Sequence, residues 1–273
     1  MAEAFSKSDI EILVATMHRN SLDFLAPMFP MCHFSEFNIL VVNQTSAENT
    51  LHSGYPTIKV INSFEKGLSR SRNLALKNAT AKLCVITDDD VVFADGFMES
   101  ILIAFNENSS AALIAFRAEK SDGMLYKKYP NQRIAVKNLI QRLNIMSIEM
   151  VLNRDFLQRS NITFNTNFGL GANFSMGEEA IFINDINKKK MLMIMEPQVI
   201  VRHNNIDTHA RASIKEKYYV QGALFTNIVN NNYFMLVLLK LAHEIKHNKI
   251  KFTEIPKAIA ATLKGRQAFK KMI

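Results

Sequence analysis

The chain has 273 residues, 48% of them hydrophobic, which is enough for one large α/β domain or for a domain with an appendage. Two cysteines form no disulfide framework, and the N-terminus lacks the basic and apolar regions of a signal peptide, so a secreted, disulfide-rich class is excluded and a cytoplasmic protein is expected. The net charge of +8 is uneven, because residues 1–210 hold 21 basic and 22 acidic residues whereas residues 211–273 hold 12 and 3.

Three apolar segments near the N-terminus predict buried strands, at residues 10–15, 37–42 and 57–61. Thr16 follows the first strand, and Asn43 and Gln44 follow the second. Residues 24–29 predict a helix that ends at Pro30. Because ligands bind beyond the carboxyl ends of strands in open α/β sheets, we expect the polar residues to lie at a ligand-binding edge.

A basic segment follows, in which Gly67 permits a tight turn and Ser69 is a plausible N-cap of a helix. Lys66, Arg70 and Arg72 gather at the start of this helix, where the helix dipole disfavours cations. A bound phosphate would explain them, since free N–H groups and basic side chains both attract anions. An exposed basic helix start is an equally good interpretation.

The stretch that dominates the sequence is an apolar run, residues 83–86, followed by Asp88, Asp89 and Asp90. In an extended segment alternate residues share a face, so Asp88 and Asp90 can converge on one ion while Asp89 points elsewhere. Carboxylate ligands favour a hard cation, Mg²⁺ or Mn²⁺, that shares phosphate oxygens with a substrate. The alternative is a loop whose acids cap the next helix, near Asp95.

The remaining apolar patterns predict alternating helices and strands. Helices are expected at residues 95–105 and 154–159, and strands at 111–116, 146–151, 191–195 and 199–201, with a break at Pro197. Residues 120–133 are polar and predict a surface loop.

A glycine-rich segment, residues 164–177, precedes a helix that opens with Glu178 and Glu179. Acids in a first helical turn complement the helix dipole, which accounts for at least one of them. The functional interpretation makes one a general base beside a loop that orders over the substrate. His203 ends an apolar run, so it is either structural or a metal or phosphate contact.

The order of these elements resembles family 2 glycosyltransferases with the GT-A fold, of the bacterial kind that builds surface polysaccharides. The resemblance covers about residues 9–205. The matching segments are Ala15-Thr16, Gly67-Leu68-Ser69-Arg70-Ser71-Arg72-Asn73, Asp88-Asp89-Asp90, Gly169-Leu170-Gly171, Gly177-Glu178-Glu179 and Val201-Arg202-His203.

This resemblance implies an enzyme that binds a nucleotide-diphosphate sugar, with a UDP-sugar expected, and inverts the anomeric centre. Asp88 and Asp90 would hold Mn²⁺ or Mg²⁺ on the diphosphate, with His203 a further contact. Glu179 matches the catalytic base, and Glu178 is the acid beside it.

By the same resemblance, the nucleotide pocket would be lined by Ala15, Thr16, Asn43, Gln44, Gly67, Arg72, Asp88 and Asp89. The acceptor would be a glycan or a lipid-linked sugar. The chain departs from the family where Asn43 and Gln44 replace a frequent Asp, which leaves the choice of nucleotide open. It departs again where Asn165 and Thr166 replace a frequent Asp-Glu, which puts the loop contact and the acceptor in doubt.

The fold expected is therefore α/β, a GT-A (Rossmann-like) mixed and mainly parallel sheet with flanking helices. Residues 1–205 would form the catalytic domain and residues 206–273 a basic, apolar helical extension. Segments 218–228 and 233–245 predict helices too short to span a bilayer. They suit attachment to an anionic membrane surface, on the inner face of the cell membrane, or packing on the catalytic domain with a basic outer face.

Two other function classes compete with glycosyl transfer. A non-catalytic nucleic-acid-binding protein would use the basic tail, but the tail has no recognition motif and no nucleic-acid partner is expected. A sugar nucleotidyltransferase would need a glycine-rich loop after the first strand, and residues 16–20 contain no glycine.

Overall fold

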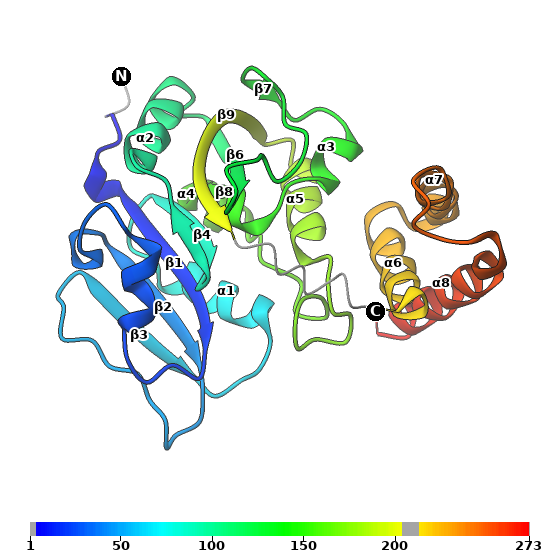
Figure 1. Cartoon of the computed structure of the whole chain (residues 1–273), viewed down its shortest axis with the longest axis horizontal. Coiled ribbons are helices and arrows are strands. Elements are labelled where there is room, and N and C mark those ends of the chain that lie inside the picture. The colour runs from blue at the N-terminus through cyan, green and yellow to red at the C-terminus, as the bar shows by residue number, and fades with distance from the viewer. Residues whose placement is uncertain (1–3, 204–212, 273) are drawn as a thin grey trace.

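The computed structural model describes residues 4–203 and 213–272, and it is a mixed α/β fold with helices on both faces of one sheet (Figure 1). The sheet has nine strands in the order β3-β2-β1-β4-β8-β6-β9-β5, with β7 paired to β9. The strands are β1 (Ile10–Met17), β2 (Ile39–Gln44), β3 (Ile58–Ser63), β4 (Leu83–Asp88), β5 (Val91–Phe93), β6 (Ala111–Lys120), β7 (Ile134–Ala135), β8 (Met150–Asn153) and β9 (Leu192–His203). The α-helices are α1 (Leu68–Asn78), α2 (Phe97–Glu107), α3 (Leu139–Leu143), α4 (Arg154–Ser160), α5 (Glu178–Lys188), α6 (Ile214–Val229), α7 (Tyr233–Lys246) and α8 (Ile255–Lys270).

The first four strands by position, β3, β2, β1 and β4, are parallel, so their carboxyl ends lie at one edge. Thr16 stands opposite Asn43 in this register, and Ala15 stands opposite Asp88. Apolar runs form β1, β2 and β4 because both faces of the sheet are covered there, whereas the edge strand β3 is only partly buried. The strands' carboxyl ends and their polar residues therefore meet at one edge, as the sequence predicts.

The second half of the sheet brings His203 to the acidic loop. Strand β9 runs parallel to β6, and the short strand β5 pairs antiparallel with the end of β9, so that Val91 lies opposite His203. Asp90 precedes Val91 and consequently lies beside His203, although 113 positions separate them in the chain.

The two faces of the sheet carry separate hydrophobic cores. One core packs α2, through Phe97, Ile101 and Phe105, against the strands. The other packs α1, α4 and α5 against the opposite face, with Phe182 and Ile183 fully buried. This layering holds α1 and α5 on the same side, which places their N-terminal ends near one another.

Three expectations about local structure are wrong. Residues 24–29 form a 3-10 helix, Asp23–Met28, since Pro27 removes an α-helical hydrogen bond. Pro197 does not end a strand, because the pairing of β9 with β6 is irregular between Met195 and Val199 and the extra residues there need no ladder bond. The N-cap of α1 is Gly67, and Ser69 lies inside the helix.

The C-terminal helices α6, α7 and α8 form a third hydrophobic cluster with residues of the preceding part of the chain. Phe168, Phe174 and Ile181 are buried in that cluster, so the tail packs on the glycine-rich loop and on α5. The boundary expected between residues 205 and 206 lies outside the described residues. Within the described part, every helix is too short or too polar to cross a membrane.

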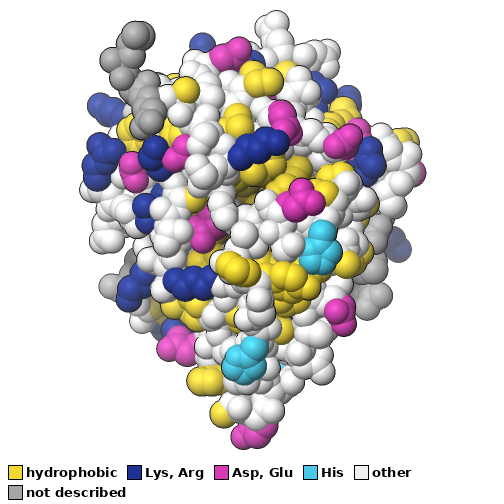
Figure 2. Space-filling model, turned by 90° about the vertical axis from the view of Figure 1, so that its left-hand side faces the viewer, with side chains coloured by type: hydrophobic (Ala, Val, Ile, Leu, Met, Phe, Trp, Pro, Cys, Tyr) yellow, Lys and Arg dark blue, Asp and Glu magenta, His cyan; other side chains and the backbone are white. Residues whose placement is uncertain are grey.

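At the end of the molecule away from α6, α7 and α8, acidic and basic side chains are interspersed on the surface (Figure 2).

Candidate active site

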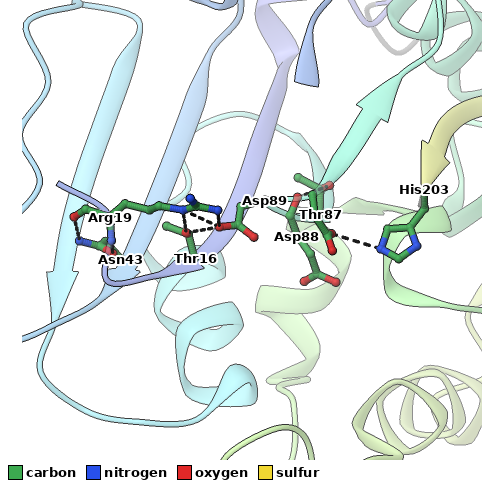
Figure 3. Close-up of polar contacts among 8 residues, drawn as sticks. Thr16, Arg19, Asn43, Thr87, Asp88, Asp89 and His203 are labelled. Carbon is green, nitrogen blue, oxygen red and sulfur yellow. Dashed lines mark hydrogen bonds and ion pairs between the residues drawn. The ribbon is translucent and has the colours of Figure 1, made fainter. Parts of the chain in front are cut away.

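The three aspartates at the end of β4 contact three different partners, two of which, Arg19 and His203, are drawn at the sheet edge in Figure 3. Asp88 pairs with Arg72, Asp89 with Arg19, and Asp90 with His203. None of the three aspartates caps α2, because its N-cap is Gly96 and no side chain bonds to the start of the helix. Asp89 points away from the other two, as the alternation of an extended chain predicts.

Asp89 is held by Arg19, a residue that sequence reasoning missed. Both Nε and Nη2 of Arg19 donate to Oδ2 of Asp89, at 2.9 and 2.7 Å, and the Thr16 hydroxyl donates to the same oxygen. Asn43 is fully buried and accepts from the backbone N–H of Arg19 at 3.1 Å while donating to its carbonyl at 3.0 Å. Asn43 thus positions Arg19, whose side chain remains 42% exposed at the edge. The signal available in the sequence was a basic residue in the polar turn after the first strand.

The start of α1 is closed by hydrogen bonds within the protein. The Gly67 N–H donates to Oε1 of Gln44 at 2.7 Å, and the Leu68 N–H donates to the carbonyl of Leu170 at 2.9 Å. Arg70 pairs with Glu65 on the surface at 2.9 Å. Gln44 and Gly67, both predicted to line the nucleotide pocket, are therefore bonded to each other.

Arg72 does not stand at an exposed helix start. It is 2% exposed and donates to Asp88 Oδ1 at 3.1 Å and Ser147 Oγ at 2.8 Å. It also pairs with Oε1 of Glu178 at 3.0 Å and Oε1 of Glu179 at 3.4 Å. One guanidinium therefore joins the end of β4 to the start of α5. Burial lowers the pKa of Arg72, but the three carboxylates outweigh burial and raise it, so the side chain stays charged.

The two glutamates differ in their surroundings. Glu178 is buried, and burial together with the charge of Glu179 raises its pKa to about 8. Glu179 is 25% exposed. Gly169 packs against the Glu178 carboxyl, where an added Cβ would come within 3.2 Å of it. At neutral pH the buried acid is largely protonated, and Glu179 is the carboxylate that solvent and substrate can reach.

Asp90, the most exposed of the three aspartates, pairs with His203. Asp90 Oδ1 lies 3.2 Å from His203 Nε2, and Asp90 is 61% exposed. The hydrogen bond to His203 lowers the pKa of Asp90, and the same bond raises the pKa of His203. Nδ1 of His203 is buried without a hydrogen-bond partner among the described residues.

The segment predicted as a surface loop is anchored beside these residues. Lys127 donates to the fully buried Glu149 at 2.7 Å, and the Tyr129 hydroxyl donates to the same carboxylate at 2.5 Å. The ring of Tyr126 lies 6.0 Å from that of His203. Burial lowers the pKa of Lys127, while the charges of Glu149 and Glu179 oppose this effect. The segment therefore brings a cation and an aromatic ring toward the site.

The donor types at the edge suit a hard divalent ion, since they are carboxylates and one imidazole. Asp90 and His203 already lie together. Within the described residues, however, no three His, Cys, Asp or Glu side chains are arranged to hold a metal, and Arg72 occupies Asp88 Oδ1. The described residues therefore offer two adjacent side chains, Asp90 and His203, that could contact a metal.

Comparison with known proteins identifies the family of the chain. The family described as glycosyl transferase family 2 matches residues 19–181, which is more than half of the chain. The chain belongs to this family. No curated sequence matches the chain.

Solved structures similar to this glycosyltransferase share its fold. The structure of residues 1–349 of S. aureus TarS has a TM-score of 0.60 at 15% identity, covering 94% of this chain and 80% of that one. The same TarS fragment in complex with UDP-GlcNAc has a TM-score of 0.58 at 16% identity, covering 92% and 79%. The complex with UDP has a TM-score of 0.54 at 15% identity, covering 94% and 80%.

Proposed function

We propose that this family 2 glycosyltransferase transfers a sugar from a UDP-sugar, with inversion, to a glycan or lipid-linked acceptor during cell-surface polysaccharide synthesis. The family supports the reaction class. TarS, which shares the fold, binds UDP-GlcNAc and UDP in its complexes, and this supports a uridine nucleotide as the donor carrier. The acceptor and the pathway rest on the resemblance of the motifs.

The observation that carries the proposal is the buried Arg72, which joins the carboxylate at the end of β4 to the two at the start of α5. Asp88 lies at the carboxyl ends of the parallel strands, where the nucleotide would bind. Glu179 lies toward Lys127, in the segment of residues 120–133. A donor diphosphate near Asp88 would therefore place its sugar within reach of Glu179.

In this mechanism Glu179 takes the proton from the acceptor hydroxyl as that oxygen attacks the anomeric carbon and the diphosphate leaves from the opposite face. Arg72 fixes the carboxylate by one hydrogen bond at 3.4 Å, and the Glu179 side chain is 25% exposed. Glu178 stays protonated at neutral pH, so Arg72 faces fewer negative charges than its three carboxyl neighbours would otherwise present.

The leaving diphosphate gains negative charge and needs cations beside it. Asp90 and His203 would hold a divalent ion, Mn²⁺ or Mg²⁺, which would neutralise charge on the diphosphate oxygens. Arg19, which pairs with Asp89, is an exposed cation of the same edge. The nucleotidyltransferase and nucleic-acid-binding alternatives are not favoured, because the chain belongs to a glycosyltransferase family.

The test is nucleotide release from a panel of sugar nucleotides by the parent and by Asp90→Ala, each with and without Mn²⁺ or Mg²⁺. We expect release only with UDP-sugars, only with metal, and none from Asp90→Ala although it melts at the parental temperature. Asp185→Ala, which removes an exposed acid of α5, is the matched control and should behave as the parent does. Full turnover by Asp90→Ala in saturating metal would remove this residue from the mechanism.

A further inference from the structure

Helix α7 exposes a row of large apolar side chains that the fold does not cover. Met235, Leu238 and Leu239 lie three and four positions apart, so they share one face of the helix, and Phe234 borders it. Leu239 is 60% exposed and Met235 57%. The opposite face of α7 is buried through Val237 and Leu241 in the cluster with α6. The exposed apolar row therefore does not contribute to the packing of α7 on the rest of the chain.

The charge beside this row is positive. Lys246 continues the exposed face of α7, and Lys249 and Lys251 are exposed in the turn that follows, next to Phe252, which is 75% exposed. Glu244 is the single acid between residues 233 and 253, and it is buried. Its carboxylate bonds to Lys217, Lys240 and the Tyr218 hydroxyl instead of facing outward.

We propose that this surface, the outer row of α7 with the basic turn after it, docks on an anionic lipid bilayer with the helix lying in the plane of the interface. An exposed apolar row beside lysines is the combination that such binding uses, since apolar side chains enter the acyl boundary while lysines meet acidic headgroups. The helix has 14 residues, about 21 Å, which is too short to cross a bilayer.

Charge decides between a membrane and a second copy of the chain. A second copy would add the positive charge of its own Lys246, Lys249 and Lys251 to the contact with no exposed acid between residues 233 and 253 to offset it, and like charges oppose association. Anionic headgroups remove that repulsion and leave the apolar row to be buried. This inference stands apart from the proposed chemistry, because it uses no residue of the active site.

The test is sedimentation of the full-length protein with vesicles of phosphatidylcholine, alone or with phosphatidylglycerol. We expect binding only to the anionic vesicles, and weaker binding at higher salt. Removing the three lysines should lower the partition coefficient by on the order of 100-fold, at about five-fold for each. Removing two leucines of the row should lower it by about ten-fold.

Each variant has a matched control elsewhere on the surface. The test variants are Lys246→Gln/Lys249→Gln/Lys251→Gln and Leu238→Gln/Leu239→Gln. The controls are Lys188→Gln/Lys189→Gln/Lys190→Gln, which removes the same charge, and Ile103→Gln/Ile140→Gln, which removes two exposed apolar side chains. All four should melt near the parental temperature, and only the controls should bind like the parent.

Two results would overturn the proposal. Equal binding by the α7 variants and their controls would mean that general charge or other surfaces account for the attachment. Self-association in sedimentation velocity that Leu238→Gln/Leu239→Gln abolishes, without any vesicle binding by the parent, would assign this surface to a second copy of the chain.

Discussion

Replacing Arg72 tests whether one buried cation organises the site. Arg72→Met keeps much of the side-chain volume but removes the charge and every donor. Asp88, Glu178 and Glu179 then lose their common partner, as does the Ser147 hydroxyl. Glu178 can remain neutral because it is largely protonated at neutral pH. The negative charges of Asp88 and Glu179 then repel each other without a cation between them.

The magnitude follows from the burial of the pair. Removing one partner of a buried ion pair costs about 3–5 kcal/mol, because the remaining charge is left uncompensated. Arg72 is 2% exposed, whereas its charged neighbours Asp88 and Glu179 are 33% and 25% exposed, so solvent screens these contacts in part. We therefore expect Arg72→Met to lower the free energy of unfolding by about 3 kcal/mol, the lower end of that range.

Urea unfolding followed by circular dichroism measures this loss, since the chain has no tryptophan for fluorescence. Arg70→Met is the matched control, two positions earlier in α1, where Arg70 is 51% exposed and pairs with an exposed glutamate. An exposed ion pair contributes less than about 1 kcal/mol. If both variants lose the same stability, the reasoning about the buried network is refuted.

Three further outcomes follow from the same structure. The pKa of Glu178 is about 8 in the folded protein, above its value of about 4.5 in the unfolded chain, so the folded state binds its proton more tightly. The free energy of unfolding should therefore fall as the pH rises from about 4.5 to 8, and Glu178→Gln should abolish this fall in the urea midpoint. Glu179→Gln should lower kcat by about 10²–10⁴ with donor affinity unchanged, and a large loss of donor binding in calorimetry would instead mean a structural role. Gly222→Ala should cost about 1–3 kcal/mol or more, since its Cβ would meet the Thr262 carbonyl oxygen at 2.1 Å, whereas Gly54→Ala, with open space around it, should melt like the parent.

Much of the fold could be predicted from local patterns. Residues 12–15, 39–42 and 83–86, in β1, β2 and β4, are uninterrupted apolar runs, which are typical of strands covered on both faces of a sheet. The position of Asp88–Asp90 at the ligand-binding edge followed from the same argument. Family membership also agrees with the order of motifs.

The errors in local structure arose at residues whose conformation depends on a partner far away in the sequence. Pro197 predicts a strand end by itself, but β6 pairs with β9 through an irregularity that accommodates it. Ser69 predicts an N-cap, but its hydroxyl donates to the carbonyl of Phe168 at 2.6 Å, and Gly67 begins the helix. Neither partner lies within the window that a local pattern examines.

The sequence by itself determined the strands, the acidic edge and the basic tail, because burial periodicity and charge are properties of short segments. Only the tertiary structure decided what each charge faces. The sequence left Arg72 available to bind a phosphate. In the structure its guanidinium donates to Glu178, which lies 106 positions away in the chain. Electrostatic energy depends on distance in space and on exclusion of water, and both are set by the packing of α1 and α5 on one face of the sheet.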